Sequence, residues 1–263
     1  MTDTFLDKIL AIKRGRVESV KRKTDLSALK QQALSDRSST GRHRLSAVLR
    51  RKNRPNIIAE IKRASPSGGV INDKVDVAVL ARQYEIGGAA AISVLTEEDF
   101  FRGSLADLTA VREAVDLPIL RKDFIVDEFQ IYESAAAGAD VILLIVAALS
   151  EGELSDFYDL VTAELGMDVI VEIHTADELE VAARIGADII GVNNRDLRTL
   201  KVSIDVSRNL IRNRHENALM VAESGISSRK EIEELRSLGF DGFLIGETLM
   251  RSSNPAELMG GLT

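Results

Sequence analysis

Two lysines and three glutamates are the residues of this chain best suited to acid–base chemistry. Glu60 and Lys62 stand two positions apart at the end of an apolar run, and Lys122, Glu172 and Glu223 end three later runs. Carboxylates can accept protons, and ammonium groups can donate them or bind an anion, so the set fits proton transfers on an anionic substrate. Structural ion pairs are the alternative, but burying so many ions without a chemical role is unfavourable.

Glycines and small polar residues follow the last two apolar runs. Ser224 and Gly225 come directly after Glu223, and Gly246 and Glu247 end the final run. Glycine lets a ligand approach the backbone, whose N–H groups can bind a phosphate. We therefore expect a phosphate site here, with Glu247 contributing only its N–H because its side chain would repel the anion. The alternative is that these glycines only mark the turns between strand and helix.

The composition narrows the chemistry further. The chain has no cysteine and only three histidines, His43, His174 and His215, none paired at the spacing of metal ligands. Thiolate nucleophiles, disulfides and cysteine-based zinc or iron–sulfur sites are therefore excluded, and we expect no metal centre. His174 lies one step past the fifth apolar run, where we expect it to form a hydrogen bond within a turn.

The apolar runs repeat along the chain, and they alternate with segments that carry apolar residues at helical spacing. This pattern predicts eight strands, within residues 56–62, 90–96, 118–124, 140–146, 168–174, 188–194, 218–224 and 241–247. Three of them follow the same Gly-x-Asp sequence. Runs that are apolar on both faces are typical of parallel strands covered by helices. The sequence thus predicts an α/β protein with a (β/α)8 TIM barrel. A doubly wound sheet is the alternative, but no G-x-G-x-x-G turn follows a strand.

A barrel would bring the reactive side chains together. Active sites of this fold lie at the carboxyl ends of the strands, where the lysines and glutamates stand. Asp123 ends the third run, and Asn193 and Asn194 end the sixth. Because side chains alternate in direction along a strand, Glu60 and Lys62 point to the same side. We expect both to enter the mouth of the barrel.

Lys122 has the strongest case among the lysines, since it ends a strand beside Phe124. We expect desolvation and neighbouring cations to lower the pKa of Lys122, which would make it a better proton donor near neutral pH. Phe101 and Phe124 follow two strands at positions where an aromatic substrate could stack. The loop at residues 65–69, mobile by composition yet braced by Pro66, could close over the site.

Charge is distributed unevenly along the chain. Residues 1–55 contain 15 Lys and Arg against 5 Asp and Glu, whereas the remainder contains 19 against 36. Such a basic arm can bind nucleic acid, but its charges lie in helix-like sequence without interleaved aromatic residues or glycines. We expect no nucleic-acid partner and instead a solvated helical face that attracts a small anionic ligand. Residues 1–50 are then a helical extension packed on a barrel formed by residues 51–263.

No membrane segment is expected in this sequence. No apolar run reaches the roughly 18 residues that a membrane span needs. The first residues also lack the charged, apolar and small-residue order of a secretory signal. The prediction is a cytoplasmic protein that does not bind membranes.

Several motifs, spread in order over nearly the whole chain, resemble the indole-3-glycerol-phosphate synthase family. They are Glu60-x-Lys62-x-x-Ser65-Pro66-Ser67, LRKDFIVDEFQIYESAAAGADVILLI, VNNRDL, VAESGI and FLIGETLM. An N-terminal helical extension is also a feature of this family. The ordered set is far more specific than any single motif. Ile173, Thr248 and Gly68 depart from the usual Val, Ser and Lys, and none of these departures removes a reactive group.

The resemblance implies a reaction without a cofactor in tryptophan biosynthesis. In this reaction 1-(2-carboxyphenylamino)-1-deoxyribulose 5-phosphate becomes indole-3-glycerol phosphate, with loss of carbon dioxide and water. By the same resemblance Lys122 is the general acid and Glu172 is the base for the ring N–H, while Lys62 binds the carboxylate or serves as a second acid. Three more residues would orient hydroxyl groups and keep the lysines protonated: Glu60, Asn193 and Glu223.

The resemblance also implies how the substrate, an anionic phosphosugar, is held. Phosphate contacts would come from Ser224, Gly225, Gly246 and Glu247. The other substrate contacts would come from Ser65, Phe101, Phe124, Leu143, Arg195 and Leu197. The family further implies a monomer or a weak homodimer.

Two other functions are weighed against this one. A neighbouring phosphosugar barrel such as phosphoribosylanthranilate isomerase is the first, but that family relies on a catalytic cysteine, which this chain lacks. A catalytically silent phosphate binder is the second. It would be marked by the loss of Lys122 or Glu172, and both are present.

Overall fold

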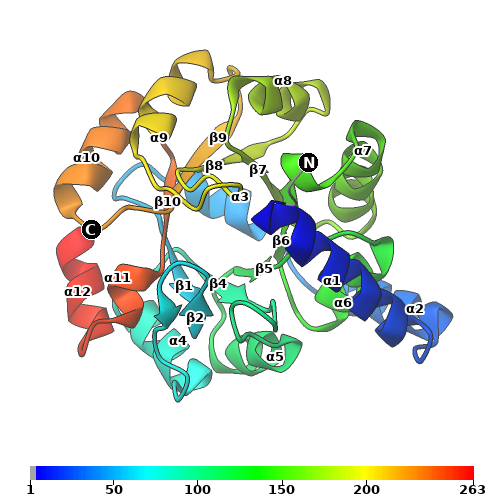
Figure 1. Cartoon of the computed structure of the whole chain (residues 1–263). Helices are drawn as coiled ribbons and strands as arrows, with labels where there is room; N and C mark the ends of the chain where they lie inside the picture. Colours follow the sequence, from blue (N-terminus) through cyan, green and yellow to red (C-terminus); the bar gives the residue numbers. More distant parts are fainter. Residues whose placement is uncertain (1–3) are drawn as a thin grey trace.

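A closed barrel of parallel strands forms the centre of the molecule, as the repeats predict. The computed structural model describes residues 4–263 (Figure 1). Neighbouring strands follow the order β1-β4-β5-β6-β7-β8-β9-β10, and β10 pairs with β1 to close the barrel. The barrel strands are β1 (Ile57–Ile61), β4 (Ala91–Leu95), β5 (Ile119–Lys122), β6 (Val141–Ile145), β7 (Asp168–Ile173), β8 (Ile189–Asn193), β9 (Leu219–Glu223) and β10 (Gly242–Ile245). A small hairpin after β1 adds β2 (Ala64–Ser65) and β3 (Gly69–Val70).

Helices alternate with the strands and surround the barrel (Figure 1). They are α4 (Val77–Ile86), α5 (Leu105–Ala114), α6 (Glu128–Ala136), α7 (Glu151–Asp159), α8 (Ala176–Arg184), α9 (Asp205–Leu210), α10 (Arg229–Leu238), α11 (Glu247–Met250) and α12 (Pro255–Leu262). Short 3₁₀ or π turns are η1 (Val146–Ala148), η2 (Leu160–Glu164) and η3 (Ile211–Asn213). Across residues 4–263, no helix combines the length and apolar character required to cross a membrane.

Local sequence decides where many of these helices begin and end. At the start of α8, Thr175 and Glu178 form a reciprocal capping box that satisfies two free backbone N–H groups. Gly138, Gly186 and Gly239, from the three Gly-x-Asp sequences, have φ values of 90°, 70° and 115°. Glycine adopts this left-handed conformation without a steric penalty, and it therefore ends a helix cleanly. The next strand begins within a few residues of each.

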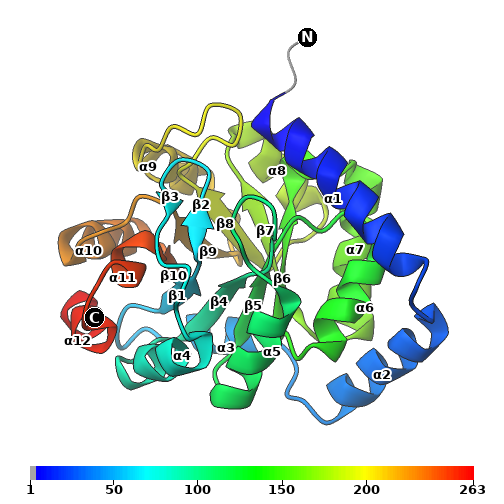
Figure 2. The ribbon, with the colours of Figure 1, turned by 60° about the horizontal axis from the view of Figure 1, so that its bottom comes forward.

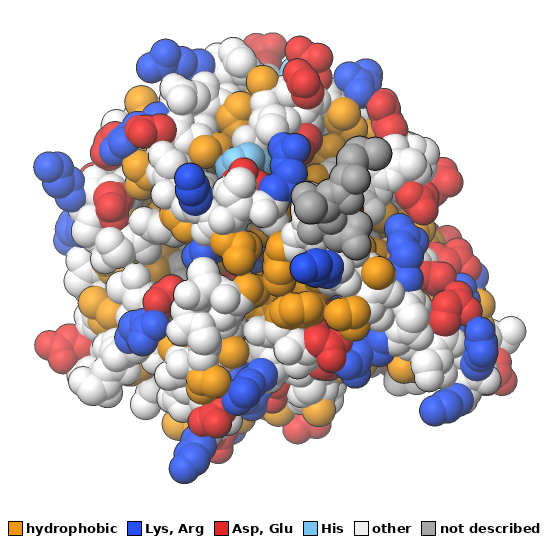
Figure 3. All heavy atoms as spheres, viewed as in Figure 1, with side chains coloured by type: hydrophobic (Ala, Val, Ile, Leu, Met, Phe, Trp, Pro, Cys, Tyr) orange, Lys and Arg blue, Asp and Glu red, His pale blue; other side chains and the backbone are white. Residues whose placement is uncertain are grey.

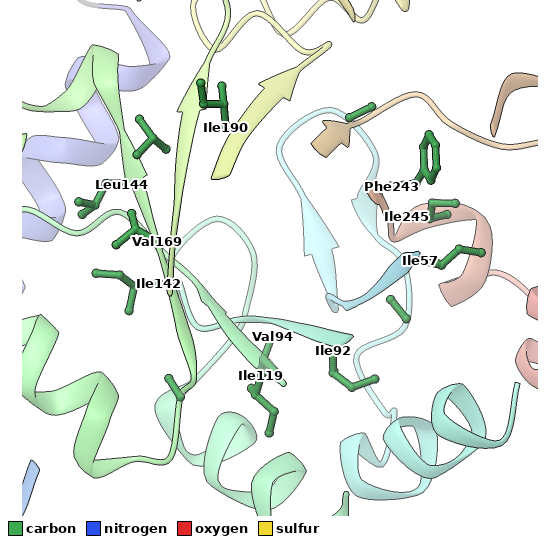
Figure 4. Packing of buried hydrophobic residues seen from close by; sticks show 14 of the residues in the cluster. Ile57, Ile92, Val94, Ile119, Ile142, Leu144, Val169, Ile190, Phe243 and Ile245 are labelled. Carbon is green, nitrogen blue, oxygen red and sulfur yellow. The ribbon is translucent and has the colours of Figure 1, made fainter. Parts of the chain in front are cut away.

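Both faces of the strands are buried, in two separate clusters. Side chains such as Ile57 and Ile92 belong to the outer cluster and point from the barrel toward the helices (Figure 4). Ile58 belongs to the inner cluster. Because directions alternate along β1, Glu60 and Lys62 follow Ile58 on the inward side. The polar residues at the carboxyl ends of the strands that share a face with the inner cluster therefore point into the barrel.

Three helices precede the barrel: α1 (Phe5–Lys21), α2 (Leu26–Ser38) and α3 (Arg44–Leu49). α3 closes the amino-terminal end of the barrel, where Leu45 and Leu49 join the inner cluster. α2 packs against α6, and α1 crosses the rim at the carboxyl ends of the strands (Figure 2). The division of the chain near residue 50 stays a prediction, and residues 1–3 of the predicted extension lie outside the described residues.

The basic extension is less solvated than predicted. Lys13 and Arg37 are buried. Lys13 pairs with Asp123 at 2.8 Å, and Arg37 pairs with Asp140 at 3.2 Å. The prediction of a solvated face is wrong for these two residues. Each forms a buried ion pair with a barrel carboxylate that lies far away in the sequence.

Candidate active site

A cavity of about 470 Å³ opens at the carboxyl ends of the strands. Every residue to which the resemblance gives a catalytic, substrate-binding or phosphate-binding role lines this cavity, whereas Asn194, which was expected at the same rim, does not. The polar residues with predicted acid–base roles are Glu60, Lys62, Lys122, Glu172, Asn193 and Glu223, and the others are Ser65, Phe101, Phe124, Leu143, Arg195, Leu197, Ser224, Gly225, Gly246 and Glu247. Closure of the barrel therefore gathers residues from distant parts of the chain into one pocket, and their individual roles stay predictions.

Lys122 stands at the centre of the charged residues. Its Nζ lies 2.9 Å from Glu172 Oε2 and 3.2 Å from Glu223 Oε2. Glu60, Lys122, Glu172 and Glu223 come from alternate strands of the barrel. Side chains from alternate strands form one layer of a barrel interior, a layer that is usually aliphatic. In this chain the layer nearest the cavity is ionisable.

The two lysines have different carboxylate partners. Lys62 Nζ lies 2.6 Å from Glu60 Oε2, so Lys62, directly after β1, points to the same side as Glu60, as the alternation predicts. Lys122 instead contacts Glu172 across the barrel. A proton can therefore pass directly between Lys122 and Glu172, whereas Lys62 is held by Glu60.

The prediction that neighbouring cations lower the pKa of Lys122 is wrong. Burial by itself lowers this pKa, but the carboxylates of Glu172, Glu223 and Glu60 outweigh it and raise the pKa of Lys122 well above its ordinary value. Arg121, the adjacent cation, points away and donates to Glu133 at 2.8 Å. Lys122 is therefore protonated at neutral pH, the form that a general acid needs, but the raised pKa makes it a weaker proton donor than the predicted shift would have made it.

The pKa of Glu223 is also raised, but by burial and by neighbouring carboxylates. Burial and the charge of Glu172 raise the pKa of Glu223, Lys122 partly offsets them, and the result is a pKa of about 7. At neutral pH this carboxyl group is thus close to its own pKa. Glu223 can therefore take up or release a proton near neutral pH while Lys122 stays in place.

The predicted phosphate site has an unusual backbone. Ser224 and Gly225, directly after β9, have φ values of 66° and 75°. Asn194 supports this turn because its Nδ2–H donates to Ser224 O at 3.0 Å. Consecutive N–H groups in such turns form concave anion-binding sites. Gly246 lines the same cavity at the end of the neighbouring strand, so both predicted halves of the phosphate site lie together.

Glu247 adds a negative charge beside this turn. Its Oε1 accepts hydrogen bonds from Arg251 Nη2 at 2.9 Å and Nε at 3.0 Å. Both side chains line the cavity, and Arg251 offsets the charge that would otherwise repel a phosphate. The contribution of the Glu247 N–H to a ligand stays a prediction.

Apolar side chains line the rest of the cavity, and they gather at the mouth of the barrel in the space-filling view (Figure 3). Beyond the predicted residues, the lining includes Phe5, Leu95, Ile145 and Leu244. Strand alternation could have found the last three, whereas nothing in the sequence places Phe5 of α1 at the cavity. The Phe5 ring packs edge-on against Phe100, with 5.1 Å between centroids. A flat aromatic ligand would be surrounded by these side chains.

The hairpin after β1 is tied to the loop after β8. Arg195 Nη1 donates to Ser67 Oγ at 2.9 Å across the cavity mouth. Within the hairpin, Ser65 Oγ accepts from Gly68 N at 3.0 Å. The contact from Arg195 adds to the bracing expected from Pro66, and closure of this loop over a ligand stays a prediction.

Two polar residues near the cavity stabilise the fold. Asn194 Oδ1 accepts hydrogen bonds from Ser207 N at 3.1 Å and Ser207 Oγ at 2.8 Å. His174 Nδ1 lies 2.7 Å from Asn193 O at the end of β8, so the His174 ring forms a hydrogen bond, but to the neighbouring strand and not within its own turn as predicted. Asn193 itself uses Oδ1 to accept from Arg195 N at 2.9 Å, which positions the loop after β8.

Gly191 belongs to the site and was not predicted. It lies in β8, and a Cβ built at this position would overlap with Glu223 Oε1 and stand 2.7 Å from Ile170 Cγ2. Glycine therefore leaves the space that the Glu223 carboxylate occupies. A glycine inside an apolar strand is a signal of such a close approach and could have found it.

We expect Gly191→Ala to lower both the unfolding temperature and the turnover. Overpacking a buried position costs about 1–3 kcal/mol, and relief of the clash would displace Glu223 from Lys122. Gly15→Ala is the control, because no atom lies within 4 Å of its Cβ and alanine favours a helix. Calorimetry of both variants measures the effect. Equal unfolding temperatures for Gly191→Ala and the wild type would contradict this expectation.

The fold and the cavity together define a class of protein. The closed (β/α)8 barrel carries ionisable side chains at the carboxyl ends of its strands, and a turn suited to phosphate follows the seventh strand. This is the architecture of TIM-barrel enzymes that act on phosphorylated compounds.

Comparison with known proteins gives the family within this class. The family model described as indole-3-glycerol phosphate synthase matches residues 6–260. The indole-3-glycerol phosphate synthase of Desulfosudis oleivorans is 52% identical over 77% of this chain and 77% of its own length. That of Carboxydothermus hydrogenoformans is 45% identical over 97% of this chain and 98% of its own. The chain belongs to the indole-3-glycerol phosphate synthase family, as its motifs predict.

Solved structures show the same architecture at much lower identity. A 3-hexulose-6-phosphate synthase from Salmonella typhimurium has a TM-score of 0.63 and 16% identity, and covers 79% of this chain and 96% of its own. A thiamine phosphate pyrophosphorylase from Pyrococcus furiosus has a TM-score of 0.61 and 17% identity, with 83% and 95% covered. At these identities the likeness shows the barrel fold alone.

Proposed function

We propose that this chain converts 1-(2-carboxyphenylamino)-1-deoxyribulose 5-phosphate into indole-3-glycerol phosphate, carbon dioxide and water. The observation that carries the proposal is the position of Lys122, which enters the cavity in contact with Glu172 and Glu223. One protonated amine and an adjacent carboxylate are the acid and base that this reaction requires. Membership of the family supports the same assignment.

The cavity offers a separate environment for each end of this substrate. The turn at Ser224 and Gly225 suits the phosphate, and the apolar side chains around Phe101 and Phe124 suit the aromatic ring. Lys62, held near the cavity by Glu60, can pair with the ring carboxylate. Arg195, in the loop after β8, and Ser65, in β2 of the hairpin, then position the chain of hydroxyl groups between the two ends.

In the first step a new carbon–carbon bond forms between the substituted ring carbon and the ketone carbon. The ketone oxygen gains a proton from Lys122 and becomes a hydroxyl group. The bond to the carboxyl group then breaks, carbon dioxide leaves, and the electrons of that bond restore the aromatic ring. Because the ring itself accepts these electrons, we propose a carboxy-lyase reaction that needs no cofactor.

In the last step the hydroxyl group leaves as water. Lys62, free once the carboxyl group has left as carbon dioxide, acts as the second acid and donates a proton to the departing oxygen, while Glu172 removes a proton from the new five-membered ring. The 2.9 Å contact between Glu172 and Lys122 gives this proton a direct path back to the amine. Lys122 and Glu172 would thus be restored together, and the second acid would recover its proton from solvent, which balances the loss of carbon dioxide from a carboxylate. Glu60, Asn193 and Glu223 would orient the hydroxyl groups and hold the lysines charged.

The direct test is turnover of the proposed substrate by the purified protein, with EDTA present and no nucleotide added. The chain contains no tryptophan, so the fluorescence of the indole product is free of protein indole background. We expect carbon dioxide and the indole product in equal amounts. Binding without turnover would instead favour the silent binder, and a need for added metal would refute cofactor independence.

The remaining statements about the cellular context stay predictions. They are the cytoplasmic location, the absence of nucleic-acid and membrane partners, and a monomer or weak homodimer.

A further inference from the structure

Lys13 is a buried cation that comes from the extension and not from the barrel. It lies in α1 and is 3% exposed. Its Nζ lies 2.8 Å from Asp123 Oδ1 and 3.0 Å from Glu98 Oε2. A buried charge is tolerated only with well-placed partners. Lys13 therefore forms a fixed contact between α1 and the carboxyl end of the barrel.

Asp123 lies between a predicted catalytic residue and a predicted ring contact. Its Oδ1 also accepts from Phe124 N at 2.8 Å. Its Oδ2 accepts from Thr96 Oγ1 at 2.6 Å and from Arg121 Nη2 at 3.3 Å. Both oxygens are thus engaged, and together they fix the turn from which Lys122 and Phe124 enter the cavity.

The second partner of Lys13 lies in the loop that carries Phe101. Glu98 follows Glu97, a buried carboxylate that accepts hydrogen bonds at 2.8–3.1 Å from the backbone N–H groups of residues 99–101. This loop is therefore ordered around one side chain and attached to α1 beside it. α1 contacts both loops that bring aromatic side chains to the cavity.

We propose that Lys13 is a positioning residue for the active site, because through Asp123 it fixes the backbone that carries Lys122 and Phe124. The inference rests on the function proposed above, in which Lys122 is the general acid. A displacement of about 1 Å at a reacting group can lower the rate by about a hundredfold. Loss of the Lys13 ammonium would leave Asp123 Oδ1 with only a backbone partner, and Asp123 would lose its ion pair with α1.

Arg37 provides a matched control within the same extension. It is also buried and also pairs with a barrel carboxylate, Asp140 Oδ1, at 3.2 Å. Asp140, however, directly precedes β6, at the amino-terminal end of the barrel and away from the cavity. Lys13→Met and Arg37→Met each remove one buried cation, and both are expected to lower the unfolding temperature.

Steady-state kinetics below both unfolding temperatures separates the two effects. We expect Lys13→Met to lower kcat by about ten- to a hundredfold, with a smaller change in KM, while Arg37→Met stays within about twofold of the wild-type kcat. Equal losses of kcat in the two variants would overturn the inference, because they would reflect stability alone. If Lys13→Met does not fold, Lys13→Gln, which keeps a hydrogen-bond donor, takes its place under the same criteria.

Hydrogen exchange tests the positioning without turnover. We expect faster amide exchange at residues 122–126 in Lys13→Met than in either Arg37→Met or the wild type. Unchanged exchange at these residues would overturn the inference. An inactive wild-type protein would instead refute the proposed function, and the exchange result would still decide whether Lys13 fixes the turn.

Discussion

Lys122→Ala is expected to lower kcat by about two to four decades, the usual contribution of a positioned proton donor. The ketone becomes electrophilic only when its oxygen receives a proton, and the raised pKa of Lys122 keeps that proton available at neutral pH. We expect an unchanged circular dichroism spectrum and a substrate affinity within roughly tenfold of the wild type, because the interaction that is lost forms in the transition state. Indole fluorescence measures the rate.

Lys122→Arg separates proton donation from positive charge. The guanidinium keeps the charge near Glu172 and Glu223 but does not release a proton in proteins. We expect this variant to be nearly as slow as Lys122→Ala. Recovery of turnover by arginine would show that charge alone is required, and near-wild-type turnover of Lys122→Ala would refute the catalytic role altogether.

Glu172→Gln is expected to produce a loss of similar size, about two to four decades in the formation of indole product. The substitution preserves shape, but the amide cannot accept the ring proton during dehydration. Because Glu172 acts after carbon dioxide has left, we expect carbon dioxide to appear faster than the indole product in a single turnover. Parallel measurement of dissolved carbon dioxide and indole absorbance gives the two rates.

Glu223→Gln is the matched control for this variant. Glu223 also approaches Lys122, at 3.2 Å, but it has no assigned role in removing a proton. We therefore expect a smaller loss and no lag between carbon dioxide and indole. Equal behaviour of the two glutamine variants would mean that Glu172 acts only through its charge on Lys122, which would contradict its assignment as the base.

These variants change side chains in the layer of the barrel interior that lies nearest the cavity, and this layer consists of ionisable residues. In a barrel of this type the inward side chains of alternate strands usually form a packed aliphatic layer. In this chain the layer is occupied by four ionisable residues, Glu60, Lys122, Glu172 and Glu223. Their burial costs the free energy of removing charged groups from water. Charged groups that are held fixed in such a site can stabilise developing charge without reorganising during the reaction. This preorganisation is the physical advantage that the proposed function draws from the fold.

The sequence by itself determined the barrel and the location of its site. Strands buried on both faces need apolar residues at most positions, and the βα repeats carry their own helix caps and glycine stops, so these signals are local. The reactive residues stand where each apolar run ends. Because parallel strands of a barrel end at one rim, their convergence follows from the repeat alone. This is why every residue with a predicted catalytic, substrate-binding or phosphate-binding role lines the cavity.

Only the tertiary structure decided which of these residues contact each other. Arg121 precedes Lys122 in the chain, yet alternation turns it away, and carboxylates from β7 and β9 surround the lysine instead. The sign of the pKa shift therefore depended on strand register across the closed barrel. Packing between distant segments also decides the roles of two further residues. Gly191 makes room for Glu223, and Lys13 of α1 forms an ion pair with Asp123 of the barrel. A glycine inside a strand signals a close approach, but which side chain fills the space is fixed by the geometry of closure, and no local pattern encodes that geometry.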